Sequence, residues 1–276
     1  MQAPLEAFGN YLREAKVQVD LSGTIVREPD HDKQLLPPGE RPRKHTNLGF
    51  PLVVEHDFPN GALGSDHATY SVAFELATMI PQLKEKQVLD LGCGTGLLGI
   101  QAAMAGANVI ATDLDPEAIR LSERNATENG VKLDIRFGSL FDPIKAHEKF
   151  DLILANLPHK PTPDNSEALP MGQNGGKDGN ALLSEALHGI LNSQTKGGQI
   201  LFFQHSLPDP RFLRELGKDY DLSIKSWKLR WLQEGEYGDL RQFFRQRHQD
   251  KKSFLWQEGS RDALVSCIWC ATRKTS

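Results

Sequence analysis

Short apolar runs alternate with segments of helical periodicity over much of this chain. The run QVLDL at 87–91 leads through the glycine-rich segment GCGTG into LLGIQAAMA, whose apolar positions have helical spacing. A strand that passes through a glycine turn directly into a helix is typical of the start of an α/β fold. We therefore expect strands and helices to keep alternating after it.

The same alternation continues along the sequence. Strands are expected at 87–91, 108–112, 133–137, 150–155, 197–204, 222–229 and 263–272, with helices at 97–105, 116–129, 181–193 and 209–217. Strands that alternate with helices favour a parallel sheet covered on both faces. The last strand follows another strand, so it is expected to run antiparallel at the edge. We predict an α/β fold with a seven-stranded, Rossmann-like, doubly wound sheet.

Two segments differ from this pattern. Residues 1–60 begin with a helix-like stretch and then become rich in proline, with few apolar anchors. Residues 233–262 are polar and aromatic, and they separate the last two expected strands. We expect an N-terminal arm at 1–60 and a main domain at 61–276, with an insertion or lid at 233–262.

Composition narrows the functional classes. The 276 residues carry a net charge of −4, three cysteines and a mean hydropathy of −0.44. A negative chain lacks the overall field that would hold nucleic-acid phosphate, and three cysteines cannot form a disulfide framework. The N-terminus has no apolar run of the secretory type, and no stretch is apolar enough to cross a bilayer. We expect a cytoplasmic protein without a membrane span.

The glycine turn is the first candidate binding site. Gly92, Gly94 and Gly96 lie where the first expected strand turns into its helix, and Asp113 ends the second strand. In open α/β sheets ligands bind at the carboxyl ends of the strands, where glycines allow close approach and an acid can accept hydrogen bonds from ribose hydroxyls. This order predicts an adenosine site. The alternative is a tight turn followed by an ordinary acid.

The choice of cofactor depends on Asp90. Gly94, Gly96 and Gly99 also match the dinucleotide fingerprint GxGxxG, so a nicotinamide dehydrogenase must be considered. The carboxylate of Asp90, at the end of the first strand, would repel a pyrophosphate and favour a cationic ligand. At these residues the chain resembles the class I S-adenosylmethionine-dependent methyltransferases.

The resemblance implies an enzyme of the methyltransferase class and a set of cofactor contacts. It places the amino-acid end of S-adenosylmethionine at Asp90 and the glycine turn, and the ribose at Asp113. Ser139 stands where the family usually has an acid or amide near the adenine. The residues expected to bind cofactor are Asp90, Gly92, Cys93, Gly94, Gly96, Asp113, Leu114, Ser139, Leu140 and Asn156.

A second motif, Asn156-Leu157-Pro158-His159, follows the fourth strand. It resembles the (N/D/S)-P-P-(Y/F) motif of methyltransferases that act on planar nitrogens, such as protein glutamine amides or exocyclic amines of bases. The resemblance implies that the Asn156 side-chain oxygen and the Leu157 carbonyl each accept an N–H of the acceptor. The residue before a proline is confined to extended geometry, which would hold that carbonyl in place. We expect these four residues to form the catalytic loop.

This loop departs from the family pattern at two positions. Leu157 replaces the first proline, a form that also resembles the NLPY loop of ribosomal RNA adenine dimethyltransferases. His159 replaces the aromatic residue that stacks on the substrate, and an imidazole can stack or exchange a proton near neutral pH. The alternative for His159 is a loop histidine bonded to backbone.

Segments on either side of this loop add further candidates. Gly175, Gly176, Asp178 and Gly179 resemble the GGxDGL segment of the glutamine methyltransferases, although a flexible loop that ends in a helix cap would also use these residues. In the family that the chain resembles, a loop before the first strand often covers the cofactor, and the resemblance therefore makes candidates of Gly64, Asp66, His67 and Thr69.

Two further sequence patterns, a CxxC pair and a basic aromatic stretch, are weaker evidence for function. Cys267 and Cys270 form CxxC in an expected strand, where residues three apart point to opposite faces, so we expect no metal site. The insertion holds arginines and aromatics that could bind RNA, or an amphipathic helix that buries Phe243 and Phe244 while its arginines face water. The residues in question, in the stretch from Trp227 to Trp256, are Trp231, Arg241, Phe243, Phe244, Arg245, Arg247, Lys251 and Lys252.

We therefore expect an S-adenosylmethionine-dependent N-methyltransferase, with a protein glutamine as the first choice of acceptor. An RNA base, a small-molecule metabolite and a scaffold that binds cofactor without catalysis stay open as alternatives. A protein or small-molecule acceptor is favoured over nucleic acid.

Overall fold

The computed structural model describes residues 2–26, 43–45, 48–54, 67–163 and 169–275. The chain divides into two compact units, which are described separately. The parallel unit comprises Asp32–Asn156, His188–Phe203 and Thr275–Ser276, and the antiparallel unit comprises Met1–His31, Leu157–Leu187 and Gln204–Lys274.

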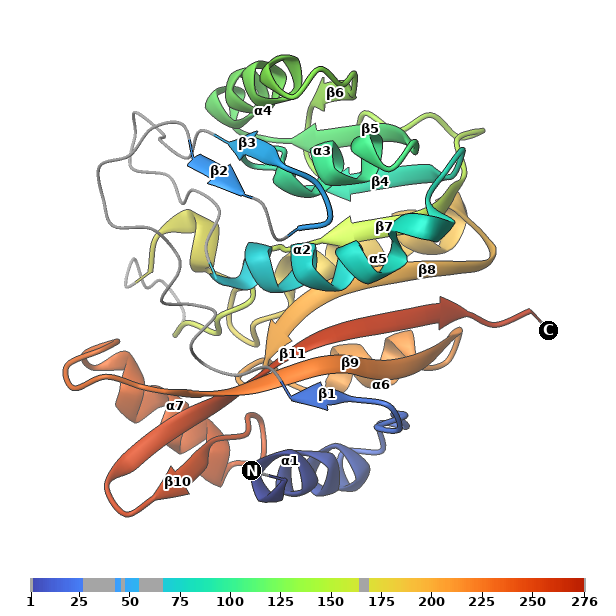
Figure 1. Ribbon diagram of the computed structural model, residues 1–276. Helices are drawn as coiled ribbons and strands as arrows, with labels where there is room; N and C mark the ends of the chain where they lie inside the picture. Colours follow the sequence, from blue (N-terminus) through green and yellow to red (C-terminus); the bar gives the residue numbers. More distant parts are fainter. Residues whose placement is uncertain (1, 27–42, 46–47, 55–66, 164–168, 276) are drawn as a thin grey trace. The chain divides into compact units, whose positions relative to one another are not determined.

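The parallel unit contains a sheet of parallel strands. In spatial order its strands are β8 (Gln194–His205), β7 (Phe150–Ala155), β4 (Gln87–Leu91), β5 (Asn108–Asp113) and β6 (Asp134–Phe137). Figure 1 shows this order, with β4 next to both β5 and β7. β4 and β7 are almost continuously buried, as expected for strands covered on both faces. The predicted parallel α/β arrangement is confirmed.

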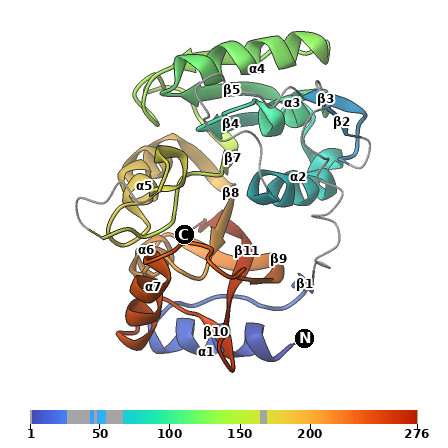
Figure 2. The same cartoon turned by 90° about the vertical axis from the view of Figure 1, so that its left-hand side faces the viewer.

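Helices connect these strands. They are α2 (His67–Met79), η2 (Ile80–Gln82), α3 (Leu97–Met104), α4 (Pro116–Glu128) and α5 (Ala181–Ser193), whose last residues belong to this unit. Figure 2 shows α2 and α3 on the same face of the strands. The Asp115 side chain caps α4 by accepting from the Glu117 N–H at 2.9 Å, with Pro116 in the first turn. A hairpin of β2 (Arg43–His45) and β3 (Leu52–Val54) completes the unit.

The antiparallel unit is built on a long strand pair. β9 (Tyr220–Trp231) and β11 (Arg261–Arg273) pair antiparallel, with a register shift between Ile268 and Trp269. The short strands β10 (Trp256–Glu258) and β1 (Ile25–Val26) extend this pair, β10 on β11 and β1 on β9. The antiparallel direction of the last strand is confirmed, but its expected position at the edge is wrong, because β11 pairs with β9 on one side and β10 on the other. Cys267 and Cys270 are buried in β11 as free thiols.

The described part of the antiparallel unit also contains α1 (Ala3–Glu14), η3 (Met171–Gln173), α6 (Arg211–Leu216), α7 (Leu240–Gln249) and the first residues of α5. α1 buries Leu5, Phe8 and Leu12, and the Phe8 ring lies 5.4 Å from that of Phe254. The predicted helical start of the N-terminal arm is thus present, whereas most of its proline-rich stretch lies outside the described residues. The division into an arm and a main domain stays a prediction.

α7 lies within the predicted insertion and is amphipathic. Phe244 is fully buried in a cluster with Leu240, whereas Phe243 is only partly buried. The alternative in which all the arginines of this helix face water is wrong for Arg247, which is buried. No helix within the described part of the chain has the length and apolar character that a membrane span requires.

Candidate functional site

The glycine turn between β4 and α3 is fixed by hydrogen bonds to the next strand. The N–H groups of Gly92 and Cys93 donate to the Thr112 carbonyl at 2.9 and 3.0 Å. Gly92, Gly94 and Gly96 have φ angles of 70°, 53° and 78°, a backbone region that favours glycine. The backbone conformation of the turn therefore favours glycine at these three positions.

Gly94 and Gly96 meet different surroundings. A Cβ at Gly96 would lie 2.8 Å from the Cβ of Ser122, so this glycine allows the turn to pack on α4. A Cβ at Gly94 would meet no atom of the described chain within 4 Å. The Gly94 N–H donates to an Asp113 carboxylate oxygen at 2.8 Å. The turn is thus packed on one side and open at Gly94, where a ligand could approach the backbone.

Asp90 lies beneath this turn. Its side chain is 1% exposed, and one carboxylate oxygen accepts the Gly99 N–H at 2.8 Å. Burial raises the pKa of Asp90 to about 7, and the nearby charge of Asp113 adds to this rise. Asp90 therefore supports the turn from below by accepting the Gly99 N–H, and its contact with the cofactor stays a prediction.

Asp113 ends β5 beside the turn. Its carboxylate accepts N–H groups from Gly94 and Asp115, and burial raises its pKa. Each carboxylate oxygen can accept more than one hydrogen bond, so the group can still serve ribose hydroxyls. Leu114, the next residue, is 58% exposed and offers an apolar surface.

The segment after β6 is attached to the end of β5. The Gly138 N–H donates to the Asp113 carbonyl at 2.9 Å, and the Thr112 hydroxyl donates to the Leu140 carbonyl at 3.1 Å. Leu140 has a φ of 45°, a strained value for a branched residue. Ser139 and Leu140 are thereby placed near the end of β5, and their contact with adenine stays a prediction.

Cys93 is a small buried residue of the turn. Its sulfur lies 3.9 Å from the Ser122 hydroxyl, and burial raises the pKa of the thiol well above its ordinary value. A thiol that keeps its proton is a poor nucleophile. The arrangement therefore gives Cys93 a packing role below the turn.

This group of residues fits S-adenosylmethionine. Two carboxylates, Asp90 and Asp113, lie at the turn and favour a ligand with a cationic end over a pyrophosphate. Gly94 leaves space for that ligand, and Leu114 supplies an apolar surface suited to a base. The chemistry of the donor set thus agrees with the cofactor that the sequence predicted.

Asn156 follows β7 at the carboxyl edge of the same sheet. Its side-chain nitrogen donates to the Thr69 hydroxyl of α2 at 2.8 Å. Because the amide nitrogen is directed at Thr69, the amide oxygen is the atom that remains to accept a hydrogen bond from a ligand. Thr69 was one of the residues expected before the first strand, whereas Gly64 and Asp66 lie outside the described residues. The His67 ring contacts Phe203, with centroids 5.8 Å apart.

The rest of the NLPH loop (156–159) belongs to the antiparallel unit. Leu157 and His159 are both buried there, and His159 Nδ1 lies 2.7 Å from the Leu157 carbonyl oxygen. For this contact to be a hydrogen bond the ring must carry its proton on Nδ1. The rings of His159 and His205 lie 4.4 Å apart, tilted by 60°. The imidazole thus supports the carbonyl that was expected to accept a substrate N–H.

The GGKDG loop (174–180) lies directly against this loop. A Cβ at Gly175 would lie 2.6 Å from His159 Cα, and one at Gly179 would lie 2.9 Å from the His159 carbonyl oxygen. The Gly175 N–H donates to the Lys160 carbonyl at 2.8 Å. These glycines are therefore needed for contact between two backbones, beyond any requirement of a flexible loop.

Asp178 and Asn180 have more specific roles than a helix cap. The Asn180 side chain accepts from the Gln204 amide at 2.9 Å and donates to the Asp209 carbonyl at 2.8 Å. Asp178 accepts the Asn180 N–H at 2.9 Å. The loop is thus attached to the chain that follows β8.

Sequence reasoning missed His205, which lies in the antiparallel unit beside His159. His205 ends β8, so the rule that ligand-side residues follow the carboxyl ends of strands could have identified it. Sequence reasoning named Arg247 only as a possible RNA contact or a water-facing side chain, because its bonds to the Lys177 and Lys252 carbonyls leave no sequence signal.

Comparisons with known proteins agree with these motifs. A family model described as ribosomal protein L11 methyltransferase matches residues 58–164. A protein of Methanocaldococcus jannaschii named "Putative protein N5-glutamine methyltransferase" is 36% identical over 151 residues, which cover 52% of this chain and 76% of that protein.

Other matches cover smaller parts of the relatives or are more distant. A release factor glutamine methyltransferase of Deinococcus radiodurans is 43% identical over 93 residues, which cover 32% of each chain. Among solved structures, a 16S rRNA N2 G1207 methyltransferase of T. thermophilus has a TM-score of 0.49 and 16% identity, with 87% of this chain and 52% of that chain covered.

Proposed function

This chain belongs to the class I S-adenosylmethionine-dependent methyltransferases, and on that premise we propose that it methylates the side-chain nitrogen of a protein glutamine. The observation that carries the proposal is the orientation of Asn156, whose amide nitrogen is bonded to Thr69. This leaves its oxygen as an acceptor at the carboxyl edge of the sheet.

The acceptor chemistry requires such an oxygen. The lone pair of an amide nitrogen is delocalised into its carbonyl, so the nitrogen is a poor nucleophile. Two hydrogen-bond acceptors that draw its N–H groups out of the amide plane expose the lone pair for in-line attack. When bound, S-adenosylmethionine supplies a methyl group on a positively charged sulfur. The glutamine nitrogen held by these acceptors would take this methyl group and release one N–H proton to water.

Two groups of the NLPH loop can serve as these acceptors. The first is the Asn156 oxygen, and the second is the Leu157 carbonyl, which precedes Pro158 and is therefore held in extended geometry. His159 already donates to this carbonyl, and a carbonyl oxygen has a second lone pair for the substrate. Holding the acceptor in position for attack can supply several kcal/mol.

The cofactor is assigned to the glycine turn. Asp90 and the turn would attract the amino-acid end, Asp113 would bind the ribose, and Leu114 with Ser139 and Leu140 would face the adenine. Opposite charge and the open backbone at Gly94 support this assignment.

The names of the relatives support a protein acceptor. Two are named glutamine methyltransferases, and the matching family model is named for a ribosomal protein. A protein of the translation machinery as acceptor would place the reaction in the cytoplasm. The chain spans only 32% of the length of the Deinococcus relative, so the acceptor is inferred from the shared motifs alone.

The test uses methyl-labelled S-adenosylmethionine with the purified protein and an extract of cells that lack it. The extract is then separated into protein, RNA and small molecules. We expect label in the protein fraction and, after acid hydrolysis of that fraction, labelled methylamine, which only an N-methylated amide side chain releases. Asn156→Ala should lower the rate roughly 100-fold, because the lost acceptor acts in the transition state.

Cofactor binding provides the control. S-adenosylhomocysteine should bind Asn156→Ala as it binds the wild type, whereas Asp113→Ala should bind it more weakly because the ribose loses a charged partner. Thr69→Val should lower the rate less than Asn156→Ala, since it frees the amide without removing it. Label in the RNA fraction would show that the acceptor is an RNA base and not a protein glutamine. Cofactor binding without label in any fraction would support the scaffold alternative.

A further inference from the structure

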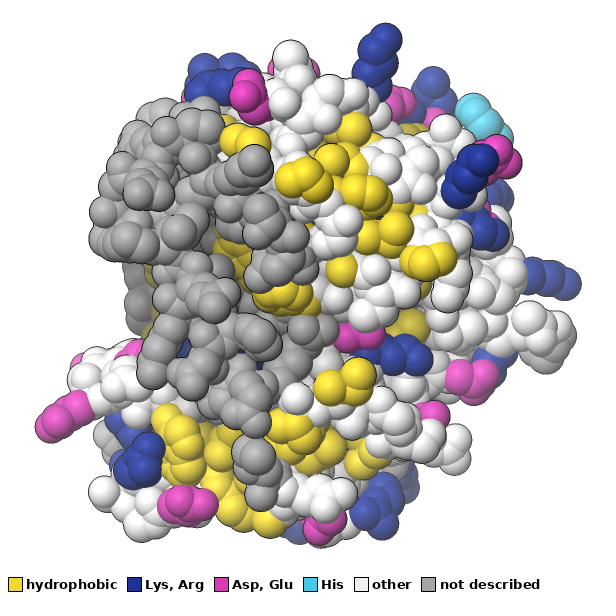
Figure 3. Space-filling view, in the orientation of Figure 1, with side chains coloured by type: hydrophobic (Ala, Val, Ile, Leu, Met, Phe, Trp, Pro, Cys, Tyr) yellow, Lys and Arg dark blue, Asp and Glu magenta, His cyan; other side chains and the backbone are white. Residues whose placement is uncertain are grey.

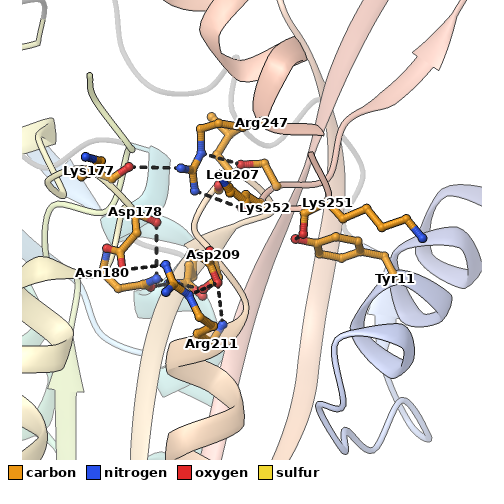
Figure 4. Close-up of polar contacts among 12 residues, drawn as sticks. Tyr11, Lys177, Asp178, Asn180, Leu207, Asp209, Arg211, Arg247, Lys251 and Lys252 are labelled. Atoms are coloured by element: carbon orange, nitrogen blue, oxygen red, sulfur yellow. Dashed lines mark hydrogen bonds and ion pairs between the residues drawn. The ribbon is translucent and has the colours of Figure 1, made fainter. Parts of the chain in front are cut away.

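The insertion contains a buried arginine that contacts another loop. Arg247 lies on α7 and is only 7% exposed. Its guanidinium donates three hydrogen bonds, to the Ser253 hydroxyl at 3.0 Å, to the Lys252 carbonyl at 3.0 Å and to the Lys177 carbonyl at 3.1 Å. Figure 4 shows the guanidinium pointing between Lys177 and the segment after α7. Two of these bonds are local to the insertion, and the third reaches the GGKDG loop.

Two carboxylates near Arg247, those of Asp209 and Asp178, favour its positive charge. Burial lowers its pKa, and the charges of Asp209 and Asp178 oppose that change. Asp209 lies after β8, and its N–H donates to the Asp178 carbonyl at 2.8 Å. The GGKDG loop is therefore held on two sides, by Asp209 and by Arg247 (Figure 4).

The GGKDG loop in turn fixes the NLPH loop. Lys160 donates its N–H to the Gln173 carbonyl at 3.1 Å and accepts the Gly175 N–H, while the Thr162 N–H donates to the Gly176 carbonyl at 2.9 Å. The approach of Gly175 to His159 leaves no room for a Cβ. A displacement of the GGKDG loop must therefore displace the backbone of the NLPH loop.

We propose that Arg247 is a positioning residue for the methyl acceptor, acting through the Lys177 carbonyl and the GGKDG loop on the carbonyl of Leu157. This inference rests on the proposed function, because it assumes that the NLPH loop binds the acceptor. It assigns the insertion a part in the reaction although Arg247 touches neither substrate nor cofactor.

Arg245→Gln provides a matched control. Arg245 lies on the same helix, and its guanidinium contacts Asp262 and the Ser260 carbonyl instead of the GGKDG loop. Arg247→Gln should lower kcat for methylation of the extract protein fraction by roughly 10- to 100-fold, as expected when a reacting group is misplaced. Affinity for S-adenosylhomocysteine should stay within about twofold, because the cofactor contacts lie elsewhere. Arg247→Lys keeps the charge with fewer donors and should fall between Arg247→Gln and the wild type.

Hydrogen exchange tests the same proposal without an acceptor. The N–H groups of Gly175 and Thr162 report the contact between the two loops, so peptides over 157–163 and 171–180 should exchange about 10-fold faster in Arg247→Gln than in the wild type. Arg245→Gln should match the wild type. The measurement is made well below the unfolding temperature of each variant.

The outcomes separate the two proposals. Faster exchange in Arg247→Gln, with no methylation by the wild type, would retain the contact between the loops and remove the proposed function. Unchanged exchange and kcat in Arg247→Gln would overturn the positioning role. So would equal losses in Arg247→Gln and Arg245→Gln, because they would indicate general weakening of the insertion. If Arg247→Gln does not fold, the same criteria apply to Arg247→Lys.

Discussion

Asp90 is a carboxyl group that the fold removes from water beneath the glycine turn. The Gly99 N–H is its hydrogen-bond donor, and Asp113 and Cys93 are the titratable groups near it. Its pKa rises from 3.8 to about 7. Between these pH values the folded protein keeps a proton that the unfolded chain releases, so the stability contributed by Asp90 falls as pH rises.

This sign gives a prediction for Asp90→Asn. Without cofactor, the wild type should lose stability relative to the variant as pH rises from 4 to 7, by an amount on the order of 4 kcal/mol. The amide has nearly the same shape and can still accept the Gly99 N–H, so the titration is the main difference. Urea unfolding at intervals over this range measures it. Parallel pH profiles for the two proteins would show that Asp90 is ionised throughout.

His159 shows how far a single position can be interpreted. The sequence identified it as a departure from a stacking aromatic and left open a bond to backbone. The structure gives the second alternative, since Nδ1 contacts the Leu157 carbonyl. The ring also packs on His205, which lies 46 positions later in the numbering and comes near only when β8 has formed. No local pattern contains that contact.

The turn from β4 to α3 yields a prediction at the scale of an element. Gly94→Ala and Gly96→Ala place the same side chain at two left-handed positions of one turn. Each should suffer backbone strain of about 1–2 kcal/mol. At Gly96 the methyl group also meets Ser122, so the total loss of stability should reach roughly 2–4 kcal/mol.

The effects on cofactor binding should follow the opposite order. The new methyl group at Gly94 would point into the space assigned to the ligand, so Gly94→Ala should weaken S-adenosylhomocysteine binding more than Gly96→Ala does. Urea unfolding and calorimetry on both variants measure the two quantities. A greater loss of stability at Gly94 than at Gly96 would contradict the packing that the structure gives to α4.

Elements with local signals were predicted closely. The strand at 87–91 and the helix at 181–193 have the expected bounds. An apolar run that ends at glycines defines the strand, an amphipathic period defines the helix, and both patterns lie within the segment that they predict. β8 begins at Gln194, three residues before the expected start at 197. The role of α7 could not be predicted, since Arg247 binds a carbonyl 70 positions away.

The charges of the whole molecule bear on the RNA alternative. On the face shown in Figure 3, basic and acidic side chains are interspersed among neutral ones. The arginines of α7 that could have bound phosphate already have partners. Arg241 and Arg245 both bind Asp262, which is fully buried, and Arg247 binds backbone carbonyls. The net charge of −4 adds no attraction.

We therefore predict weak binding to RNA. A labelled single-stranded RNA of about 20 nucleotides should bind the wild type with a Kd of about 100 μM or weaker at physiological salt, the weak end of sequence-independent binding. Asp262→Asn removes the charge that pairs two arginines and should bind the RNA more tightly, with a steeper dependence on salt. Fluorescence anisotropy over a salt series measures both proteins. Micromolar binding by the wild type with a steep salt slope would mean that another surface attracts phosphate, and an RNA base would then replace glutamine as the first choice of acceptor.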